Sequence, residues 1–201
     1  RGESFMGKFK ETSMPAVFQN RVAELGNRAC VAYKKDGKWI DISWIDVNAM
    51  VHDLAYYLMS VGVKKGDHIG LFSPNRYEWW VADLAILSIG AVNVPIYATN
   101  SAEEAEYVLD NSDSRMCFVG TKDHMAKVLQ VKKHLKKLKE VIVFDDVPSK
   151  EKNVLTLKEA FALGQKYKKK DDFDKRLQAI KPQDMAPIIY TSGTTGNPKG
   201  V

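Results

Sequence analysis

The chain has 201 residues, a length that suits one domain or one domain and part of another. Its content of 45% hydrophobic and 27% charged residues is typical of a folded globular protein and excludes a disordered or fibrous chain. The 30 lysine and arginine residues outnumber the 25 aspartate and glutamate residues and leave a net charge of +5. This modest excess allows attraction to phosphate-bearing ligands or an anionic membrane, but it indicates no nucleic-acid partner.

Few residues of the chain are suited to metal binding or disulfide formation. Cys30 and Cys117 each lie in an apolar, strand-like stretch, so we expect two structural free thiols in a reducing compartment. The four histidines are scattered, which argues against a zinc site. No run approaches the ~20 apolar residues that span a bilayer, and the N-terminus lacks the apolar segment of a signal peptide. We therefore expect a cytoplasmic protein, with residues upstream of Arg1 and with peripheral membrane contact left open.

The first third of the chain indicates a hairpin followed by a helix. Two strand-like runs, residues 29–33 and 38–42, flank an Asp-Gly pair that adopts positive φ at little cost, which predicts a β-hairpin. Residues 43–60 then show helical spacing of apolar positions, with Ser43 as the N-cap and Asp46 at the capping-box position. Gly62 is the expected end of this helix.

From residue 68 onward, strand-like and helical segments alternate. The expected strands are residues 68–73, 91–96, 115–119 and 140–144, and the expected helices are residues 77–89, a helix capped by Ser101, and residues 121–138. A polar loop over residues 145–153 precedes two further expected helices, residues 156–168 and 172–180. This alternation predicts an α/β fold, a largely parallel sheet covered by helices, with the hairpin before it.

A short apolar run, residues 186–190, leads into the sequence Thr-Ser-Gly-Thr-Thr-Gly-Asn-Pro-Lys-Gly at residues 191–200. Glycines allow backbone N–H groups to approach phosphate oxygens, hydroxyls add donors, and the lysine adds a compact positive charge. The Walker pattern does not match, because Pro198 precedes Lys199 and Gly200 follows it. Composition alone leaves two interpretations open, a phosphate-binding loop and an ordinary surface turn.

The complete string over residues 188–201 resembles the signature loop of the adenylate-forming superfamily, which includes acyl-CoA synthetases, luciferases and the adenylation domains of peptide synthetases. Two upstream segments, residues 66–79 and 83–99, resemble the matching segments of long-chain fatty acyl-CoA synthetases. The likeness covers most of the chain and is least specific over residues 122–181. It implies that residues 1–201 form the N-terminal part of the large AMP-binding domain and stop just after the phosphate-binding loop, without the small C-terminal domain.

The resemblance also implies a reaction. In this superfamily a carboxylate attacks the α-phosphate of Mg-ATP to give an acyl-adenylate and pyrophosphate, and coenzyme A then displaces AMP. Fatty acid, ATP, Mg²⁺ and CoA are thus the implied ligands, and the residues implied to grip the β- and γ-phosphates are Thr191, Ser192, Gly193, Thr194, Thr195, Gly196 and Lys199. No catalytic residue or metal ligand is implied within these 201 residues, and we expect the chain alone to lack synthetase activity. Some relatives are dimers, so a homodimer stays open, but nothing in these residues shows a partner surface and the oligomeric state is undetermined.

Two other functions stay as alternatives to fatty acid activation. One is adenylation of an aryl or amino acid, and the other is a non-catalytic nucleotide-binding module.

Three smaller features of the sequence also allow two interpretations each. The basic helix over residues 121–138 could touch anionic lipid, although a solvated face is favoured. Trp79 and Trp80, with Tyr77, could line an acyl channel or pack in the core, and Arg76 could contact a phosphate or serve as an ordinary turn residue.

Overall fold

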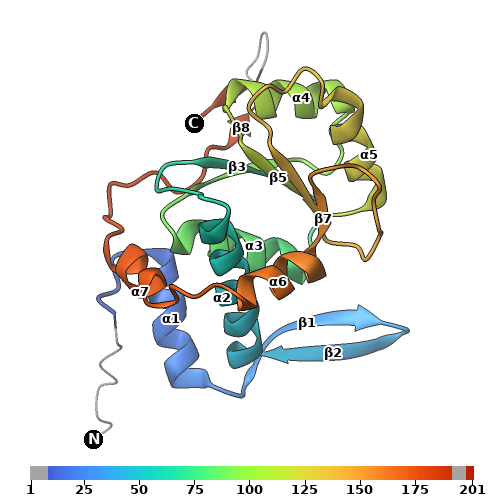
Figure 1. Ribbon diagram of the computed structural model, residues 1–201. Coiled ribbons are helices and arrows are strands. Elements are labelled where there is room, and N and C mark those ends of the chain that lie inside the picture. The colour runs from blue at the N-terminus through green and yellow to red at the C-terminus, as the bar shows by residue number, and fades with distance from the viewer. Residues whose placement is uncertain (1–8, 192–197) are drawn as a thin grey trace, which may run out of the picture.

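The computed structural model describes residues 9–191 and 198–201, and its central element is a parallel sheet with the strand order β4-β3-β5-β6-β7. Every neighbouring pair in this sheet is parallel. The strands are β3 (His68–Phe72), β4 (Val92–Ile96), β5 (Met116–Val119), β6 (Glu140–Val143) and β7 (Val154–Thr156). Parallel strands need crossover connections, and a helix supplies each one from β3 through β6, whereas a loop without a helix joins β6 to β7 (Figure 1). The predicted α/β fold is confirmed.

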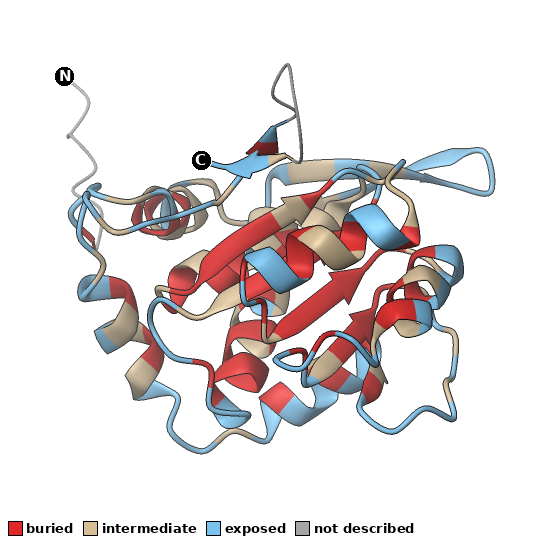
Figure 2. Ribbon diagram, turned by 90° about the horizontal axis from the view of Figure 1, so that it is seen from above, coloured by how far each residue is buried: buried red, intermediate tan, exposed pale blue. Residues whose placement is uncertain are grey.

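Successive residues of the strands point to opposite faces of the sheet, and both faces are buried. On β5, for example, Met116 and Phe118 belong to one hydrophobic core, whereas Cys117 and Val119 belong to the other. Figure 2 shows the strands as almost continuously buried between partly exposed helices. A parallel sheet covered on both faces explains why these strands read as apolar runs rather than as alternating patterns.

The helices form two layers of unequal size. The first core is covered by α1 (Met14–Leu25), α2 (Trp44–Ser60), α3 (Tyr77–Ser88), α6 (Leu157–Gln165) and α7 (Asp171–Gln178). The second core is covered by α4 (Ala102–Asn111) and α5 (Lys122–Val131), which lie on the other side of the sheet (Figure 1). The chain therefore crosses from one face of the sheet to the other between α3 and α4.

The predicted helix signals are present in the structure. The side chain of Ser43 accepts a hydrogen bond from the Asp46 N–H at the start of α2, and Ser101 and Glu104 form a reciprocal capping box on α4. At the end of α2, the Gly62 N–H donates to Met59 O and the Val63 N–H donates to Leu58 O, the pattern of a Schellman motif. Local hydrogen bonds thus set these helix ends.

The predicted hairpin is formed by β1 (Ala29–Lys35) and β2 (Lys38–Ser43), which pair antiparallel and project from the helical layer (Figure 1). Asp36 and Gly37 have φ values of 49° and 78°, as the Asp-Gly turn requires. Trp39 is 70% exposed on this hairpin.

The helix predicted over residues 121–138 is too long. Helix α5 ends at Val131, and residues 132–138 form turns with hydrogen bonds such as Leu135 N–H to Lys132 O. Lysines at positions 132, 133, 136 and 137 would place like charges four residues apart on a continued helix, which disfavours it. Leu135 and Leu138 are nevertheless buried, so the spacing of apolar residues in this segment indicates packing in the core rather than a helix.

Other differences concern short or early elements. Helix α1 was not predicted, although Ser13 caps it and a proline follows in its first turn. Strand β7 was also not predicted, because three residues are too few to show a period. The last two helices are shorter than the expected ranges 156–168 and 172–180, since α6 ends at Gln165 and α7 spans Asp171–Gln178. End positions are the least certain part of a sequence pattern.

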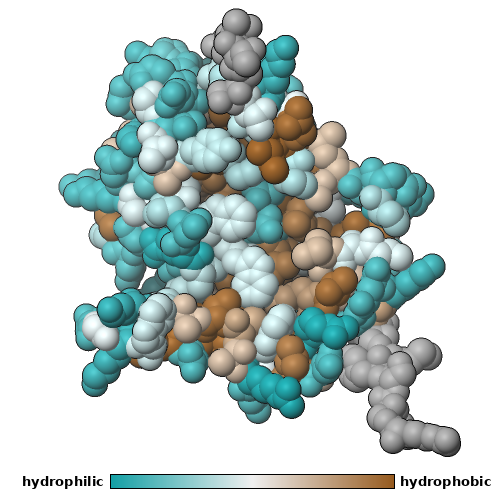
Figure 3. Space-filling model, turned by 180° about the vertical axis from the view of Figure 1, so that it is seen from behind, coloured by the Kyte–Doolittle hydropathy of each residue, from teal (hydrophilic) through white to brown (hydrophobic). Residues whose placement is uncertain are grey.

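No helix in the described part of the chain is long and apolar enough to cross a bilayer. On the face seen in Figure 3, hydrophobic side chains reach the surface in groups set among hydrophilic ones. Both cysteines are free thiols, as expected. Burial raises the pKa of Cys30 to about 11 and the pKa of Cys117 to about 12.

Helices α2 and α6 touch at Gly164, and we expect Gly164→Ala to destabilise the protein. A Cβ atom there would lie 1.8 Å from the backbone oxygen of Asp53, so the helices must separate, at a cost of about 2 to 3 kcal/mol. The neighbouring Leu163→Ala changes a 42% exposed side chain, with an expected effect within about 0.5 kcal/mol. Thermal melting of the intact protein checks this, and equal melting temperatures for the two variants would contradict it.

The raised thiol pKa values predict slow alkylation in the native protein. At pH 8 a thiol with a pKa of about 11 is ionised in about one thousandth of molecules, and only the thiolate reacts. We therefore expect peptide mass spectrometry to find Cys30 and Cys117 largely unlabelled by iodoacetamide at pH 8, with Cys117 the slower. Labelling in urea serves as the control, and rapid modification of Cys117 without denaturant would be inconsistent with its burial.

Candidate functional site

Two of the predicted phosphate-binding residues, Thr191 and Lys199, lie on the two strands of a small hairpin. Strands β8 (Tyr190–Thr191) and β9 (Lys199–Gly200) pair antiparallel, with Tyr190 opposite Gly200 and Thr191 opposite Lys199. Reciprocal backbone hydrogen bonds between Ile189 and Val201 extend the pairing. The remaining predicted residues lie outside the described part of the chain, namely Ser192, Gly193, Thr194, Thr195 and Gly196. Their placement at a phosphate stays a prediction.

Thr191 and Lys199 form the described end of the candidate site. Residues directly opposite each other in an antiparallel pair place their side chains on the same face. Both residues are exposed, and no carboxylate of the described residues forms an ion pair with Lys199. One hydroxyl and one uncompensated ammonium group therefore share a face of the hairpin, an arrangement suited to an anionic ligand.

The chain reaches this hairpin by running alongside the edge strand β4. The Asn93 N–H donates to Ala186 O at 3.0 Å, and the Ile188 N–H donates to Asn93 O at 2.9 Å, which forms a parallel bridge between Asn93 and Pro187. The Asn93 side chain donates to Asp83 Oδ1 at 2.7 Å, and burial raises the pKa of Asp83 against that bond. This parallel path carries the hairpin to the carboxyl end of β4.

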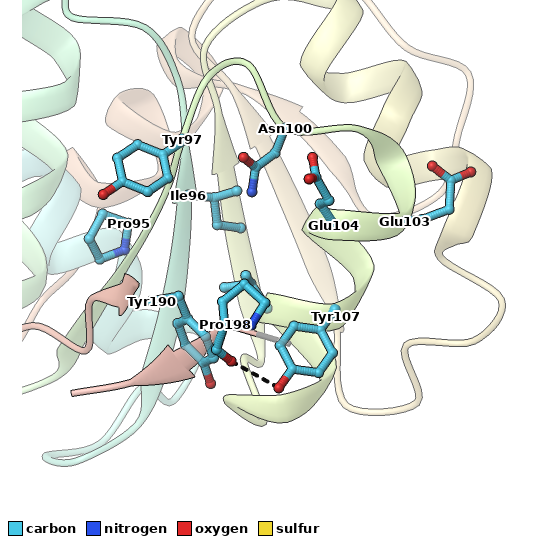
Figure 4. A pocket seen from close by; sticks show the side chains of 10 residues that line it. Pro95, Ile96, Tyr97, Asn100, Glu103, Glu104, Tyr107, Tyr190 and Pro198 are labelled. Carbon is cyan, nitrogen blue, oxygen red and sulfur yellow. Dashed lines mark hydrogen bonds between the residues drawn. The ribbon is translucent and has the colours of Figure 1, made fainter. Parts of the chain in front are cut away.

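An open cavity of about 480 Å³ lies between the hairpin, the end of β4 and helix α4 (Figure 4). Strand β4 and the loop after it supply one wall, α4 supplies another, and the hairpin closes a third; the lining is Pro95, Ile96, Tyr97, Asn100, Glu103, Glu104, Tyr107, Val108, Tyr190 and Pro198. In open α/β sheets ligands bind outside the carboxyl ends of the strands, so the cavity is in a suitable place.

Two carboxylates of this cavity already have structural partners. Glu104 Oε2 accepts from the Ser101 N–H at 2.8 Å in the capping box of α4. Hydrogen bonds from its own backbone N–H and from the Ser101 hydroxyl lower the pKa of Glu103. Both carboxylates therefore suit helix capping better than proton transfer. Within residues 9–191 and 198–201, no group of three or more histidine, cysteine, aspartate or glutamate side chains could hold a metal ion.

A second candidate position for a ligand lies between β3 and β5, where the order of the strands reverses. Arg76 occupies this position. Its guanidinium donates to both carboxylate oxygens of Glu78 at 2.8 Å, to Gly120 O at 2.6 Å and to Asp145 Oδ1 at 2.8 Å. The Glu78 bonds raise the pKa of Arg76 above its usual range. These bonds engage Arg76 within the protein and support its role as a structural residue over a phosphate ligand.

The tryptophans considered for an acyl channel pack in the core layer. The Trp80 ring meets those of Phe18 and Trp44 edge-on, with centroids 5.7 Å and 6.3 Å away. Trp79 is partly buried against the same core. Tyr77 contacts Tyr33 of the first hairpin, with ring centroids 5.0 Å apart. All three aromatic side chains therefore contribute to packing around α3.

Helix α4 supplies contacts to the site that the sequence did not reveal. The Tyr107 hydroxyl donates to Pro198 O at 3.0 Å, and the Tyr190 hydroxyl donates to Asn111 Oδ1 at 2.7 Å. Burial raises the pKa of Tyr190, which keeps its hydroxyl protonated as a donor. The only available signal was the spacing of Tyr107 and Asn111, four residues apart on a helix beginning at a predicted cap.

Curated relatives match this chain over nearly its whole length. It is 35% identical over 206 residues to the long-chain-fatty-acid–CoA ligase FadD15 of Mycobacterium bovis, covering 95% of this chain and 33% of the relative. It is 32% identical over 204 residues to the long-chain-fatty-acid–CoA ligase ACSBG2 of Xenopus laevis, covering 99% of this chain and 27% of the relative. The chain therefore spans about a third or less of the length of these relatives.

Solved structures share the fold at lower sequence identity. The anthranilate–CoA ligase AuaEII, in complex with anthranoyl-AMP, superposes with a TM-score of 0.74 at 19% identity, covering 93% of this chain and 33% of that one. The coronafacic acid ligase from Pectobacterium brasiliense has a TM-score of 0.74 at 24% identity, covering 88% and 33%. The fold is thus that of the N-terminal part of adenylate-forming enzymes.

The AMP-binding enzyme family matches residues 18–201, which include the parallel sheet and the small hairpin of β8 and β9. A match over this range leaves only the first 17 residues outside the family alignment. With the fold, the hairpin and the relatives in agreement, this chain belongs to the AMP-binding enzyme family.

Proposed function

We propose that the intact protein activates a long-chain fatty acid with ATP and transfers the acyl group to coenzyme A. The observation that carries this proposal is the pairing of Thr191 with Lys199 across the small hairpin, at the carboxyl end of β4. That pairing supports a grip on phosphate by the intervening residues 192–198. The curated relatives named long-chain-fatty-acid–CoA ligases, at 35% and 32% identity, support the choice of fatty acid and CoA.

Activation is the first step of the proposed reaction. A carboxylate oxygen of the fatty acid attacks the α-phosphorus of ATP, the bond from that phosphorus to the bridging oxygen breaks, and pyrophosphate leaves with the bonding electrons. Negative charge accumulates on the β- and γ-phosphates as this bond breaks. In this proposal the ammonium group of Lys199 and the hydroxyl of Thr191 stabilise that charge, and their shared face of the hairpin supports this role.

Thioester formation is the second proposed step. The sulfur of CoA attacks the acyl carbonyl carbon of the adenylate, and AMP leaves with the bonding electrons while the thiol proton passes to a base or to solvent. None of the described residues is assigned to this step. Mg²⁺ is proposed to enter with ATP, because its preferred oxygen ligands include the phosphates of the triphosphate.

Replacing Lys199 tests the role of the hairpin. In the intact protein, we expect Lys199→Ala to lower the rate of ATP–pyrophosphate exchange by about a hundredfold, because one preorganised charge on the leaving group is lost. Lys38→Ala, which removes an exposed lysine from the first hairpin, is the matched control and should leave the rate unchanged. Undiminished exchange by Lys199→Ala would show that the hairpin does not act on the triphosphate.

The choice of acid is tested separately. We expect exchange by the intact protein to be supported far better by a saturated long-chain fatty acid than by benzoate or by free amino acids. A preference for benzoate or an amino acid would indicate the corresponding adenylating enzyme instead. ATP binding without exchange for any acid would indicate a non-catalytic nucleotide-binding module. Residues 1–201 assayed alone form a further arm, in which we expect no exchange.

A further inference from the structure

Helix α4 contacts both strands of the phosphate-loop hairpin through side-chain hydrogen bonds. Tyr107 Oη donates to Pro198 O at 3.0 Å, immediately before β9, as Figure 4 shows. Tyr190 Oη, on β8, donates to Asn111 Oδ1 at 2.7 Å. One bond thus runs from the helix to the residue before β9, and the other runs from β8 back to the helix.

The geometry of α4 places the side chains of Tyr107 and Asn111 on the same face of the helix. Tyr107 and Asn111 are four residues apart, so they lie one above the other on one face of the helix. The opposite side of α4 is anchored, because Ala105, Val108 and Leu109 are buried in the second core and the Ser101–Glu104 capping box sets the first turn. The helix therefore offers a rigid support for the hairpin.

Aromatic packing joins the two bonds into one cluster. The rings of Tyr107 and Tyr190 meet edge to face, with centroids 6.2 Å apart and an interplanar angle of 88°. Gly200, opposite Tyr190, lies close to the same ring: a Cβ atom there would be 3.1 Å from Tyr190 Cζ and 2.8 Å from Ile188 Cγ2. The absence of a side chain at Gly200 lets β9 lie against the Tyr190 ring.

We infer that Tyr107 and Asn111 are positioning residues for the ATP-binding hairpin. They hold the two strands that flank the phosphate loop at a fixed place beside the carboxyl end of β4, so that Thr191 and Lys199 meet the triphosphate without a search for the correct position. This inference rests on the proposed function, because it assigns the hairpin to ATP. Neither residue is assigned a contact with the nucleotide, so their effect passes through Pro198 and Tyr190.

Removal of one hydroxyl tests the first contact. In the intact protein we expect Tyr107→Phe to raise the KM for ATP about three- to tenfold, the effect of one neutral hydrogen bond, with the KM for the fatty acid and the melting temperature unchanged. Tyr33→Phe removes the same group from the first hairpin and is the matched control. An unchanged KM for ATP, or an equal rise in both KM values together with a lower melting temperature, would overturn the inference.

A double-mutant cycle tests the second contact. Asn111→Ala and Tyr190→Phe break the same hydrogen bond, so we expect each to raise the KM for ATP and the double variant to do no more than either alone. Fully additive effects would show that the bond does not position the hairpin.

The Lys199→Ala variant, assayed in parallel, distinguishes a failure of the positioning inference from a failure of the proposed function. If it lowers exchange while the Tyr107 and Asn111 variants bind ATP normally, the inference alone is wrong. If Lys199→Ala leaves exchange unaltered, the proposed function fails and this inference fails with it.

Discussion

The sheet in this protein must be covered on both faces, and the position of the candidate site depends on that constraint. Adjacent residues of β5 belong to different cores, so neither face can be left in water without exposing large apolar side chains. Helices on both sides meet this need, and α3, α4 and α5 also lie in the connections between parallel strands. Because α4 covers the second face beside β4, it lies where the chain later returns along the same edge strand at Pro187.

Two cationic side chains, Arg76 and Lys199, differ in whether acidic groups in the described part of the protein neutralise them. At the change of chain direction between β3 and β5, the Arg76 cation is neutralised by Glu78 and Asp145 and bonded to Gly120. At the hairpin, Lys199 has no acidic partner among the residues that the structure describes. An ionised group with its partners in place contributes to the fold, whereas an uncompensated one is available to an anionic ligand.

The family comparison separates the fold from the choice of acid. Ligases named for anthranilate and for coronafacic acid share this architecture at 19% and 24% identity, whereas the ligases named for long-chain fatty acids have 35% and 32% identity. One architecture thus occurs in proteins named for different carboxylic acids, so the order of strands does not by itself determine the acid. The described hairpin strands, by contrast, carry groups suited to the phosphates of ATP. ATP would be the same co-substrate whichever acid is activated.

Local chemistry made much of the fold readable from the sequence. The Asp36–Gly37 turn predicts the first hairpin, Ser43 and Ser101 predict helix starts, and the contiguous motif over residues 188–201 predicts the phosphate loop, because each depends on neighbours along the chain. The end of α5 was not readable from apolar spacing, because Leu135 and Leu138 are buried by turns rather than by a continued helix. Tertiary structure alone joined Tyr107 to Pro198 and Asn111 to Tyr190, across 91 and 79 residues of sequence. A hydrogen bond over such a separation leaves no periodic signal, since it forms only after the sheet and its helices bring the two segments together.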